Sequence, residues 1–371
     1  MAEWQKIRLG EIVKTNQSTY SPKENWQFVN YLDTGNITVN KINEIQYIDS
    51  AKDKLPSRAR RKVKTNSIIY STVRPNQLHY GIIKEQPDNF LVSTGFAVID
   101  VDCDKAVPDF IYYALTKQDV TEQLQAIAEQ SVSAYPSIKP SDIENLEFTL
   151  PDGKTQERIV SILSTIDEKI KENNAINNNL EQQAHALYQK MFITNHNPNW
   201  KKGALSDLVT IRYGKDHKKL EDGSYPVYGS GGIMRYAEKP LYTGESVLIP
   251  RKGTLNNVMY VNGAFWSVDT MFYTEMLHSN IAKFVYHFVK SKDLTSMNAG
   301  SAVPSMTTNI LNAMPLYIPD DKTLSTFEEI VSPMYSQMQE NEKQSRKLAD
   351  IRDILLPRLM SGELGVSDID L

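Results

Sequence analysis

Two long polar segments of the chain carry apolar residues at an alternating spacing of four and three positions. Residues 154–193 contain no glycine or proline, and their apolar series is Ile159, Leu163, Ile166, Ile170, Leu180, Ala184, Leu187 and Met191. Adding 168 to each number gives a second series, from Phe327 to Leu359, with one charged member, Arg352. This spacing is typical of a helix that packs along another helix. We therefore predict two long helices that pair, with a kink or a fresh helix start at Pro333 in the second.

Both series are interrupted at their centre by polar residues, Asn173 and Asn177 in the first and Asn341 and Ser345 in the second. An antiparallel pair whose residue numbers sum to 518 would place Asn177 opposite Asn341 and Asn173 opposite Ser345. A parallel pair would also align these residues, so the pattern alone does not give the direction. Near-identical units joined head to tail around a pseudo-two-fold axis favour the antiparallel pair. Buried amides would fix the register, since a slipped pair would leave them facing leucine without partners; alternatively, they are exposed where the helices splay.

The segments that precede the two helices are repeated as well. "YPSIKPSDIENLEFTLPDGKT" (135–155) aligns without a gap with "VPSMTTNILNAMPLYIPDDKT" (303–323), and "WQKIRLGEIV" from Trp4 resembles "WKKGALSDLV" from Trp200. A weaker echo relates "NSIIYSTVRPN" (66–76) to "ESVLIPRKGTLNN" (245–257), each of which we interpret as a short buried strand that runs into a basic turn. The sequence therefore indicates a tandem repeat of one unit.

These patterns predict a mixed α/β (α+β) fold organised as a pseudo-two-fold tandem repeat. Two globular domains, residues 1–150 and 196–320, would be separated by two long antiparallel coiled-coil helices, in residues 151–195 and 321–371. From Pro333 to Met360 a helix would measure roughly 40 Å at ~1.5 Å per residue. That length corresponds to about 12 base pairs of duplex at ~3.4 Å each.

Composition bounds the compartment and the chemistry. The 371 residues include a single cysteine, Cys103, which excludes a disulfide framework and fits a reducing environment. The sequence has neither a charged-then-apolar leader nor an apolar run of ~18 residues, so we expect a soluble cytoplasmic protein without a membrane span. No paired His/Cys residues have zinc-ligand spacing, and neither a phosphate loop nor a serine nucleophile motif is present. We therefore predict no catalytic residue and no metal site, and two similar domains without chemistry indicate binding.

The net charge of −4 argues against a nucleic-acid partner, but local patches matter more for phosphate contacts than the sum over the chain. The segment "KDKLPSRARRKVK" (52–64) has seven basic residues against one acid, Asp53. Polar and aromatic turns also occur in both halves of the chain. Arginine and lysine suit guanine, asparagine and glutamine suit adenine, and glycine lets the backbone approach phosphate. The candidate DNA-binding residues are Arg58, Arg60, Arg61, Lys62, Lys64, Arg74, Asn76, Gln77, Tyr80, Lys215, Lys218, Lys219, Tyr228, Ser230, Arg251, Lys252, Asn256 and Asn257.

Several of these stretches together resemble the DNA specificity subunit of type I restriction–modification systems. The likeness rests on the opening W-x4-LG-E-I, on "YPVYGSGGI", "GESVLIPRKGT" and "FWSVDTMFY" between residues 225 and 273, and on the terminal "LLPRLMSGEL". It spans nearly the whole chain, including the duplicated order, and is weakest in the first globular domain.

The resemblance implies that the globular domains are target-recognition domains, each of which reads one half of a split double-stranded DNA sequence. The helices would bind two methyltransferase subunits, which use S-adenosylmethionine to methylate adenine. Two restriction/translocase subunits, with ATP and Mg, would join to cut unmodified DNA. This chain would be the reader and spacer, with no active site and no directly bound cofactor.

Two alternatives stay open at this point. One is a specificity module that serves a methyltransferase–nuclease outside the type I systems. The other is a non-catalytic coiled-coil scaffold whose two domains bind proteins or glycans. A salt-dependent DNA shift would separate the scaffold from a DNA reader, because phosphate contacts weaken steeply with salt. An enzyme of an unrecognised type is the weakest reading.

Overall fold

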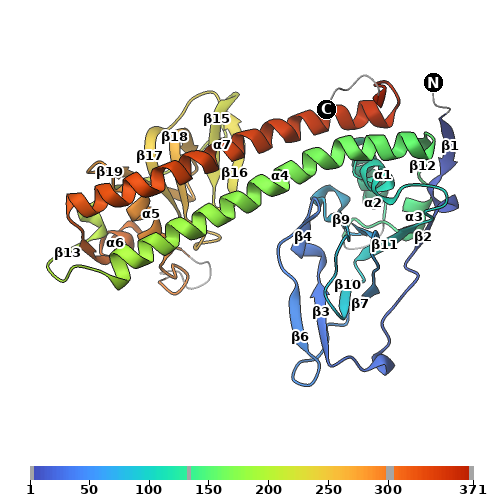
Figure 1. Cartoon of the computed structure of the whole chain (residues 1–371), viewed down its shortest axis with the longest axis horizontal. Coiled ribbons are helices and arrows are strands. Elements are labelled where there is room, and N and C mark those ends of the chain that lie inside the picture. The colour runs from blue at the N-terminus through green and yellow to red at the C-terminus, as the bar shows by residue number, and fades with distance from the viewer. Residues whose placement is uncertain (1–3, 132–134, 298–304, 367–371) are drawn as a thin grey trace. The chain divides into compact units, whose positions relative to one another are not determined.

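The computed structural model describes residues 4–131, 135–297 and 305–366. Val303 and Pro304, at the start of the second repeated segment, lie outside these ranges. The chain forms two compact units: the first comprises Met1–Lys171 and Gln344–Leu371, and the second comprises Glu172–Lys343. Each unit therefore contains a globular part and a portion of each of the two long helices, which are green (α4) and orange to red (α7) in Figure 1.

The first unit contains two four-stranded sheets, with the strand orders β6-β3-β10-β7 and β2-β11-β8-β9. β8 and β10 are buried at every residue, as their β-branched and aromatic sequences favour. The strands are β1 (Gln5–Arg8), β2 (Val13–Thr15), β3 (Phe28–Leu32), β4 (Ile37–Thr38), β5 (Lys41–Ile42), β6 (Gln46–Asp49), β7 (Ala59–Lys62), β8 (Ile68–Ser71), β9 (Tyr80–Ile82), β10 (Phe90–Ser93), β11 (Phe96–Val101) and β12 (Glu147–Leu150). The short helices are α1 (Pro108–Leu115), α2 (Gln118–Glu129) and α3 (Pro140–Glu144).

The second unit is built on one six-stranded sheet with the order β14-β19-β17-β18-β15-β16. Its strands are β13 (Lys201–Ala204), β14 (Val209–Tyr213), β15 (Asp222–Gly229), β16 (Gly232–Ala237), β17 (Tyr242–Pro250), β18 (Met259–Ser267), β19 (Met271–Met276) and β20 (Pro315–Ile318). The helix α5 (Ala282–Lys290) is buried along nearly its whole length, and α6 (Thr308–Asn312) is a short helix of five residues. The short strands predicted within 66–76 and 245–257 are present as β8 and as part of β17.

The ends of the two repeated segments meet in the same way in both units. β1 pairs antiparallel with β12 so that Gln5 faces Leu150, and β13 pairs with β20 so that Lys201 faces Ile318. The sequence offsets of 196 and 168 convert the first pair into the second. The adjacent backbone bonds follow the same rule, from Leu9 N–H to Leu146 O (2.8 Å) and from Leu205 N–H to Met314 O (3.0 Å). The duplicated sequence thus encodes one strand ladder twice.

The repeated Pro-Asp-x-x-Thr sequence caps each long helix. Asp152 accepts a hydrogen bond from the Thr155 N–H (3.0 Å), and Asp320 accepts one from the Thr323 N–H (2.9 Å). These backbone bonds hold the pKa of each aspartate below its ordinary value. The side chains thus satisfy donors that have no partner within the helix, which is why the motif recurs where each helix begins.

The helices that follow are α4 (Gly153–Tyr188), which continues as a π-helical turn to Thr194, and α7 (Asp321–Met360). In the first unit, residues near the start of α4 share an apolar core with residues near the end of α7, among them Ile159, Leu163, Leu356 and Leu359. In the second unit, residues near the end of α4 share a core with residues near the start of α7, among them Ala184, Tyr188, Phe327 and Val331. Of the predicted seam positions, Ile159, Leu163, Ala184, Phe327, Val331 and Leu359 are therefore core positions, whereas Ile170, Leu180, Met338 and Leu348, nearer the centre, are half-buried.

The polar centre of the seam is buried and hydrogen-bonded. Asn173 is 2% exposed and Asn341 6% exposed, so the alternative of exposed asparagines is wrong for these two residues. Asn341 donates to Asn177 Oδ1 (2.8 Å), Asn177 donates to the Met338 carbonyl (3.1 Å), and Asn173 donates to the Asn341 carbonyl (3.4 Å). The predicted contact between Asn177 and Asn341 is present, and we refer to these three residues as the amide layer.

Pro333 does not begin a new helix, because α7 runs without a break from Asp321 to Met360. Proline removes one backbone donor from the helix interior, and the apolar core around Val331 and Tyr335 stabilises the helix on either side of it. Among the residues that the structure describes, no helix combines the length and apolar character needed to cross a membrane.

The amide layer generates a prediction about stability. Asn341→Leu should lower the free energy of unfolding by about 1–3 kcal/mol, because Asn177 Oδ1 loses its donor in a part-buried site. Asn177→Leu combined with Asn341→Leu should cost less than the sum of the two single substitutions. Urea titration followed by circular dichroism measures both. Strictly additive costs would show that the two amides are not energetically coupled.

Candidate nucleic-acid interface

In each unit a buried central strand leads into an exposed loop that is tied to the repeated Pro-Ser segment. After β8, the Thr72 carbonyl accepts a hydrogen bond from the Ile138 N–H (2.8 Å); after β17, the Arg251 carbonyl accepts one from the Met306 N–H (2.9 Å). Isolated β-bridges join Val73 to Ser137 and Lys252 to Ser305. Ser137 and Ser305 are 168 residues apart, so the same device holds both loops, which we call the strand-exit loops (residues 72–77 and 250–257).

The strand-exit loop of the first unit displays Arg74. Its backbone is left-handed (φ 49°), its N–H donates to the Pro136 carbonyl (3.0 Å), and its carbonyl accepts from Gln77 N–H (2.9 Å). The guanidinium lies over the ring of Tyr135, 5.1 Å from its centroid. Arg74 is exposed, as are Asn76 and Gln77. A fixed backbone thus carries a side chain that rests on an aromatic face.

The strand-exit loop of the second unit displays Arg251 in a similar way. Its N–H donates to the Thr270 carbonyl (2.8 Å) and its Nη1 to the Asp269 carbonyl (3.2 Å). The guanidinium lies over the ring of Tyr213, 5.4 Å from its centroid, and that tyrosine is 52% exposed. Arg251 itself is half-buried, and Lys252 beside it is exposed.

The structure brings the other predicted stretches of the second unit toward this loop. Asn257 donates to the Ser230 carbonyl (2.7 Å), and a Cβ at Gly253 (φ +84°) would lie 2.8 Å from Ser230 Oγ, so this close approach requires glycine. Lys215 N–H donates to the Ser267 carbonyl (2.8 Å), and Tyr228 faces Ser267 between the parallel strands β15 and β18. Asn256 donates to Asp293 Oδ1 (3.2 Å), while Lys218 and Lys219 are exposed on the following turn.

The basic segment of the first unit lies partly on β7, which pairs antiparallel with β10. Arg58, directly before β7, approaches the strand-exit loop: Thr94 N–H donates to the Arg58 carbonyl and Thr72 N–H donates to the Gly95 carbonyl, each at 2.8 Å. Arg58 and Lys64 are exposed, and Arg60, Arg61 and Lys62 are half-buried. Lys62 forms an ion pair with Glu24 and lies over the Trp26 ring, 5.1 Å from its centroid. Part of the basic charge is therefore neutralised within the unit.

Tyr80 does not belong to an exposed interface. It is 5% exposed, and its ring stacks on that of Tyr70 with 5.5 Å between centroids. Burial raises its pKa to about 12. Tyr80 begins β9, a strand whose three residues are all buried, so the expectation of a surface role is wrong. Tyr135 and Tyr213, which the sequence did not single out, carry the two arginines instead.

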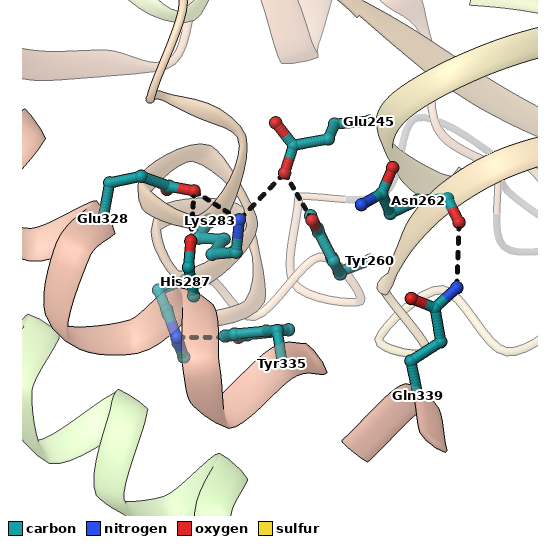
Figure 2. Close-up of polar contacts among 9 residues, drawn as sticks. Glu245, Tyr260, Asn262, Lys283, His287, Glu328, Tyr335 and Gln339 are labelled. Carbon is teal, nitrogen blue, oxygen red and sulfur yellow. Dashed lines mark hydrogen bonds and ion pairs between the residues drawn. The ribbon is translucent and has the colours of Figure 1, made fainter. Parts of the chain in front are cut away.

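A polar network fastens the six-stranded sheet of the second unit to α7 (Figure 2). Lys283 on α5 is 4% exposed and lies between Glu245 on β17 (2.8 Å) and Glu328 on α7 (2.5 Å). Tyr260 on β18 also donates to Glu245. Burial alone would raise the pKa of Glu245, but the hydrogen bonds from Lys283 and Tyr260 outweigh it and hold that pKa below its ordinary value. One buried ammonium thus links three elements.

Figure 2 shows two further contacts of α7, one with α5 and one with β18. The Tyr335 hydroxyl lies 3.0 Å from His287 Nε2, and Gln339 donates to the Asn262 carbonyl (3.3 Å). Burial lowers the pKa of His287 to about 3, so this imidazole is neutral. In the first unit Asp167 stands 168 residues before Tyr335; it accepts from the Tyr113 hydroxyl (2.7 Å) and pairs with Arg352 on α7 (2.8 Å). Each long helix therefore holds its domain from an equivalent position, with different side chains.

The described residues contain no group of three or more His, Cys, Asp or Glu side chains arranged to hold a metal ion. In each unit the candidate interface consists of loops that carry residues such as arginine, lysine, asparagine and serine. Such side chains can donate to phosphate oxygens and to base edges.

Comparison with known proteins agrees on one family. The sequence model described as the type I restriction modification DNA specificity domain matches residues 1–182 and 197–348. The HindI specificity subunit of Haemophilus influenzae, a type I restriction enzyme subunit, is 23% identical over 98% of this chain and 100% of its own length. The MjaIX specificity subunit of Methanocaldococcus jannaschii is 22% identical over 72% of this chain and 71% of its own.

Among solved structures, the type I restriction–modification S subunit from M. genitalium matches with a TM-score of 0.60 and 18% sequence identity. The match covers 97% of this chain and 96% of that one. The likeness shows that the two chains share a fold.

The buried ammonium of the polar network generates a prediction. Lys283→Met should lower the free energy of unfolding by about 3–5 kcal/mol, because Glu245 and Glu328 lose the charge that compensates them. Lys290→Met is the matched control on the same helix: its pair with Glu181 is more exposed, with 39% of the lysine side chain accessible, and should cost about 1 kcal/mol or less. Urea titration compares the two. Equal costs would show that Lys283 contributes no more than a surface charge.

Proposed function

The chain belongs to the type I restriction–modification DNA specificity family, and we propose that it is the subunit that reads a DNA target in two separate halves. Each unit would read one half through its strand-exit loop and the residues gathered around it. The observation that supports this most strongly is that both loops are tied to the Pro-Ser segments by equivalent bonds, yet carry different side chains. Two loops that are held in the same way but carry different side chains are suited to reading two different DNA sequences.

The proposed architecture is a pseudo-two-fold tandem repeat. Residues 1–150 and 196–320 would be the two target-recognition domains, and the helical regions 151–195 and 321–371 would form an antiparallel coiled coil between them. The equal register of the β1–β12 and β13–β20 ladders supports the repeat, and the amide layer supports the pairing of α4 with α7. In this proposal the coiled coil sets the number of unread base pairs between the half-sites.

The chain would act with partner subunits rather than as an enzyme. Two methyltransferase subunits, with S-adenosylmethionine, would modify adenine in both halves of the double-stranded target. Two restriction/translocase subunits, with ATP and Mg, would act on unmodified DNA. The specificity subunit would bind none of these cofactors itself and would work in the cytoplasm.

Exchange of one recognition domain tests the proposal. Residues 205–312 can be replaced by those of another family member, which leaves the β13–β20 ladder and both long helices in place. When this variant is co-expressed with its methyltransferase, single-molecule mapping of methyladenine should show a change in one half of the motif, with the other half and the gap unchanged. The mirror exchange of residues 9–144 should alter only the other half.

A change in both halves after a single exchange would contradict the assignment of one half-site to each unit. Loss of methylation by a chain that still folds and binds its methyltransferase would contradict independent reading as well.

A further inference from the structure

We propose that Arg74 and Arg251 each contact a guanine, Arg74 in one half of the DNA target and Arg251 in the other. This inference rests on the proposed function and assigns the base contact within each half. Both arginines follow a buried central strand, both project from a backbone held by hydrogen bonds, and both guanidinium groups rest on a tyrosine ring.

The backbone at each arginine is fixed by contacts from outside its own loop. Arg74 is bonded to Pro136 and stands one residue after the Val73–Ser137 bridge, while Arg251 is bonded to Thr270 and Met306 and stands one residue before the Lys252–Ser305 bridge. A side chain on such a support starts from a defined position, and this limits the entropy lost when it binds. The two loops therefore present their arginines as rigid readers.

The tyrosine rings orient the guanidinium groups. A ring 5.1–5.4 Å from the guanidinium carbon restricts the rotation of the side chain and attracts its charge through the ring quadrupole. Stacking uses the flat face of the guanidinium and leaves its edge, where the N–H donors lie, free to point elsewhere. Arg251 uses Nη1 on the Asp269 carbonyl, and a guanidinium has four further N–H donors.

Guanine is the base that fits this arrangement. Its major-groove edge carries two acceptors, O6 and N7, that match the two parallel donors of an oriented guanidinium. A phosphate contact needs only positive charge, which the exposed Lys218 and Lys219 supply without any aromatic support. The rigid support and the stacked orientation are therefore better explained by base contact than by charge alone.

Charge is also a poorer explanation because other basic residues are neutralised where they stand. Lys62 pairs with Glu24, and Lys64 lies 3.9 Å from Asp100. Arg74, which is exposed, and Arg251, which is half-buried, instead lie over tyrosine rings that carry no opposing charge.

The test uses Arg74→Gln and Arg251→Gln in the full chain, each co-expressed with its methyltransferase, and maps methyladenine by single-molecule sequencing. Each variant should lose the preference for guanine at one position of one half-site, by about ten- to a hundredfold. The two variants should affect different halves. The other half and the gap should stay as in the unsubstituted chain.

Conservative variants separate base contact from charge. Arg74→Lys and Arg251→Lys keep the charge but lose the paired donors, so they should relax the same positions as the glutamine variants. Tyr135→Leu and Tyr213→Leu keep the arginines but remove their support, and should relax those positions to a smaller extent.

Two other arginines serve as matched charge controls. Arg8→Gln in the first unit and Arg212→Gln in the second remove an exposed arginine that is held by Asn145 and by Glu275, respectively. Both controls should leave the methylated motif unchanged.

A uniform loss of methylation at all sites, with the motif unchanged and a shallower dependence on salt, would show that the arginines contact phosphate and would overturn this inference. A motif that lacks a guanine in one half would overturn it for that half. Neither result would affect the proposed function, which fails separately if the unsubstituted chain directs no two-part methylation.

Discussion

Within the second unit, the hydrogen bond between Asn177 and Asn341 favours one register of α4 against α7. Sliding one helix along the other would bury an unpaired amide against leucine or methionine, which costs more than the apolar contacts of a slipped pair return. The backbone bonds from Asn173 and Asn177 add to this constraint, because both end on carbonyls of α7. The amide layer therefore replaces some apolar burial with hydrogen bonds and favours a single register in this part of the two helices.

The two units share a set of structural contacts, which we call the frame, and differ in the sheets and loops that these contacts hold. The strand ladders, the aspartate caps and the bridges to Ser137 and Ser305 recur at matching positions. Between them the first unit folds two four-stranded sheets and the second a single six-stranded sheet. Even the fastenings to the long helices differ, with Asp167 in one unit and Tyr335 in the other. Strong constraint on the frame with freedom in the loops is what a protein needs to change its DNA target without changing its assembly.

Much of this frame was predictable from the sequence, because it depends on local or periodic signals. The heptad spacing predicts the seam residues that are buried in the core of each unit, and the central asparagines predict the contact between Asn177 and Asn341. The candidate site was harder to predict from the sequence. The support of Arg251 by Tyr213 joins residues 38 positions apart, and nothing in the spacing of either stretch indicates that they meet. The sequence places Tyr80 in an exposed turn, because the polar residues before it do not show that a buried strand begins there. The burial of Lys283 depends on carboxylates from two distant elements.

We propose that the register of α4 and α7 sets the distance between the two recognition domains. The most direct measurement is the methylated motif of a chain with one extra heptad in each helix, between Lys169 and Ile170 and between Leu348 and Ala349. In an antiparallel pair whose residue numbers sum to 518, these two points lie opposite each other. The insertions therefore leave the amide layer unchanged. Seven residues at ~1.5 Å each add about 10 Å, or about three base pairs. We expect both half-sites to be unchanged and the gap between them to be longer by about three base pairs. A folded variant that methylates DNA with the original gap would contradict the proposal that the helix register sets this distance.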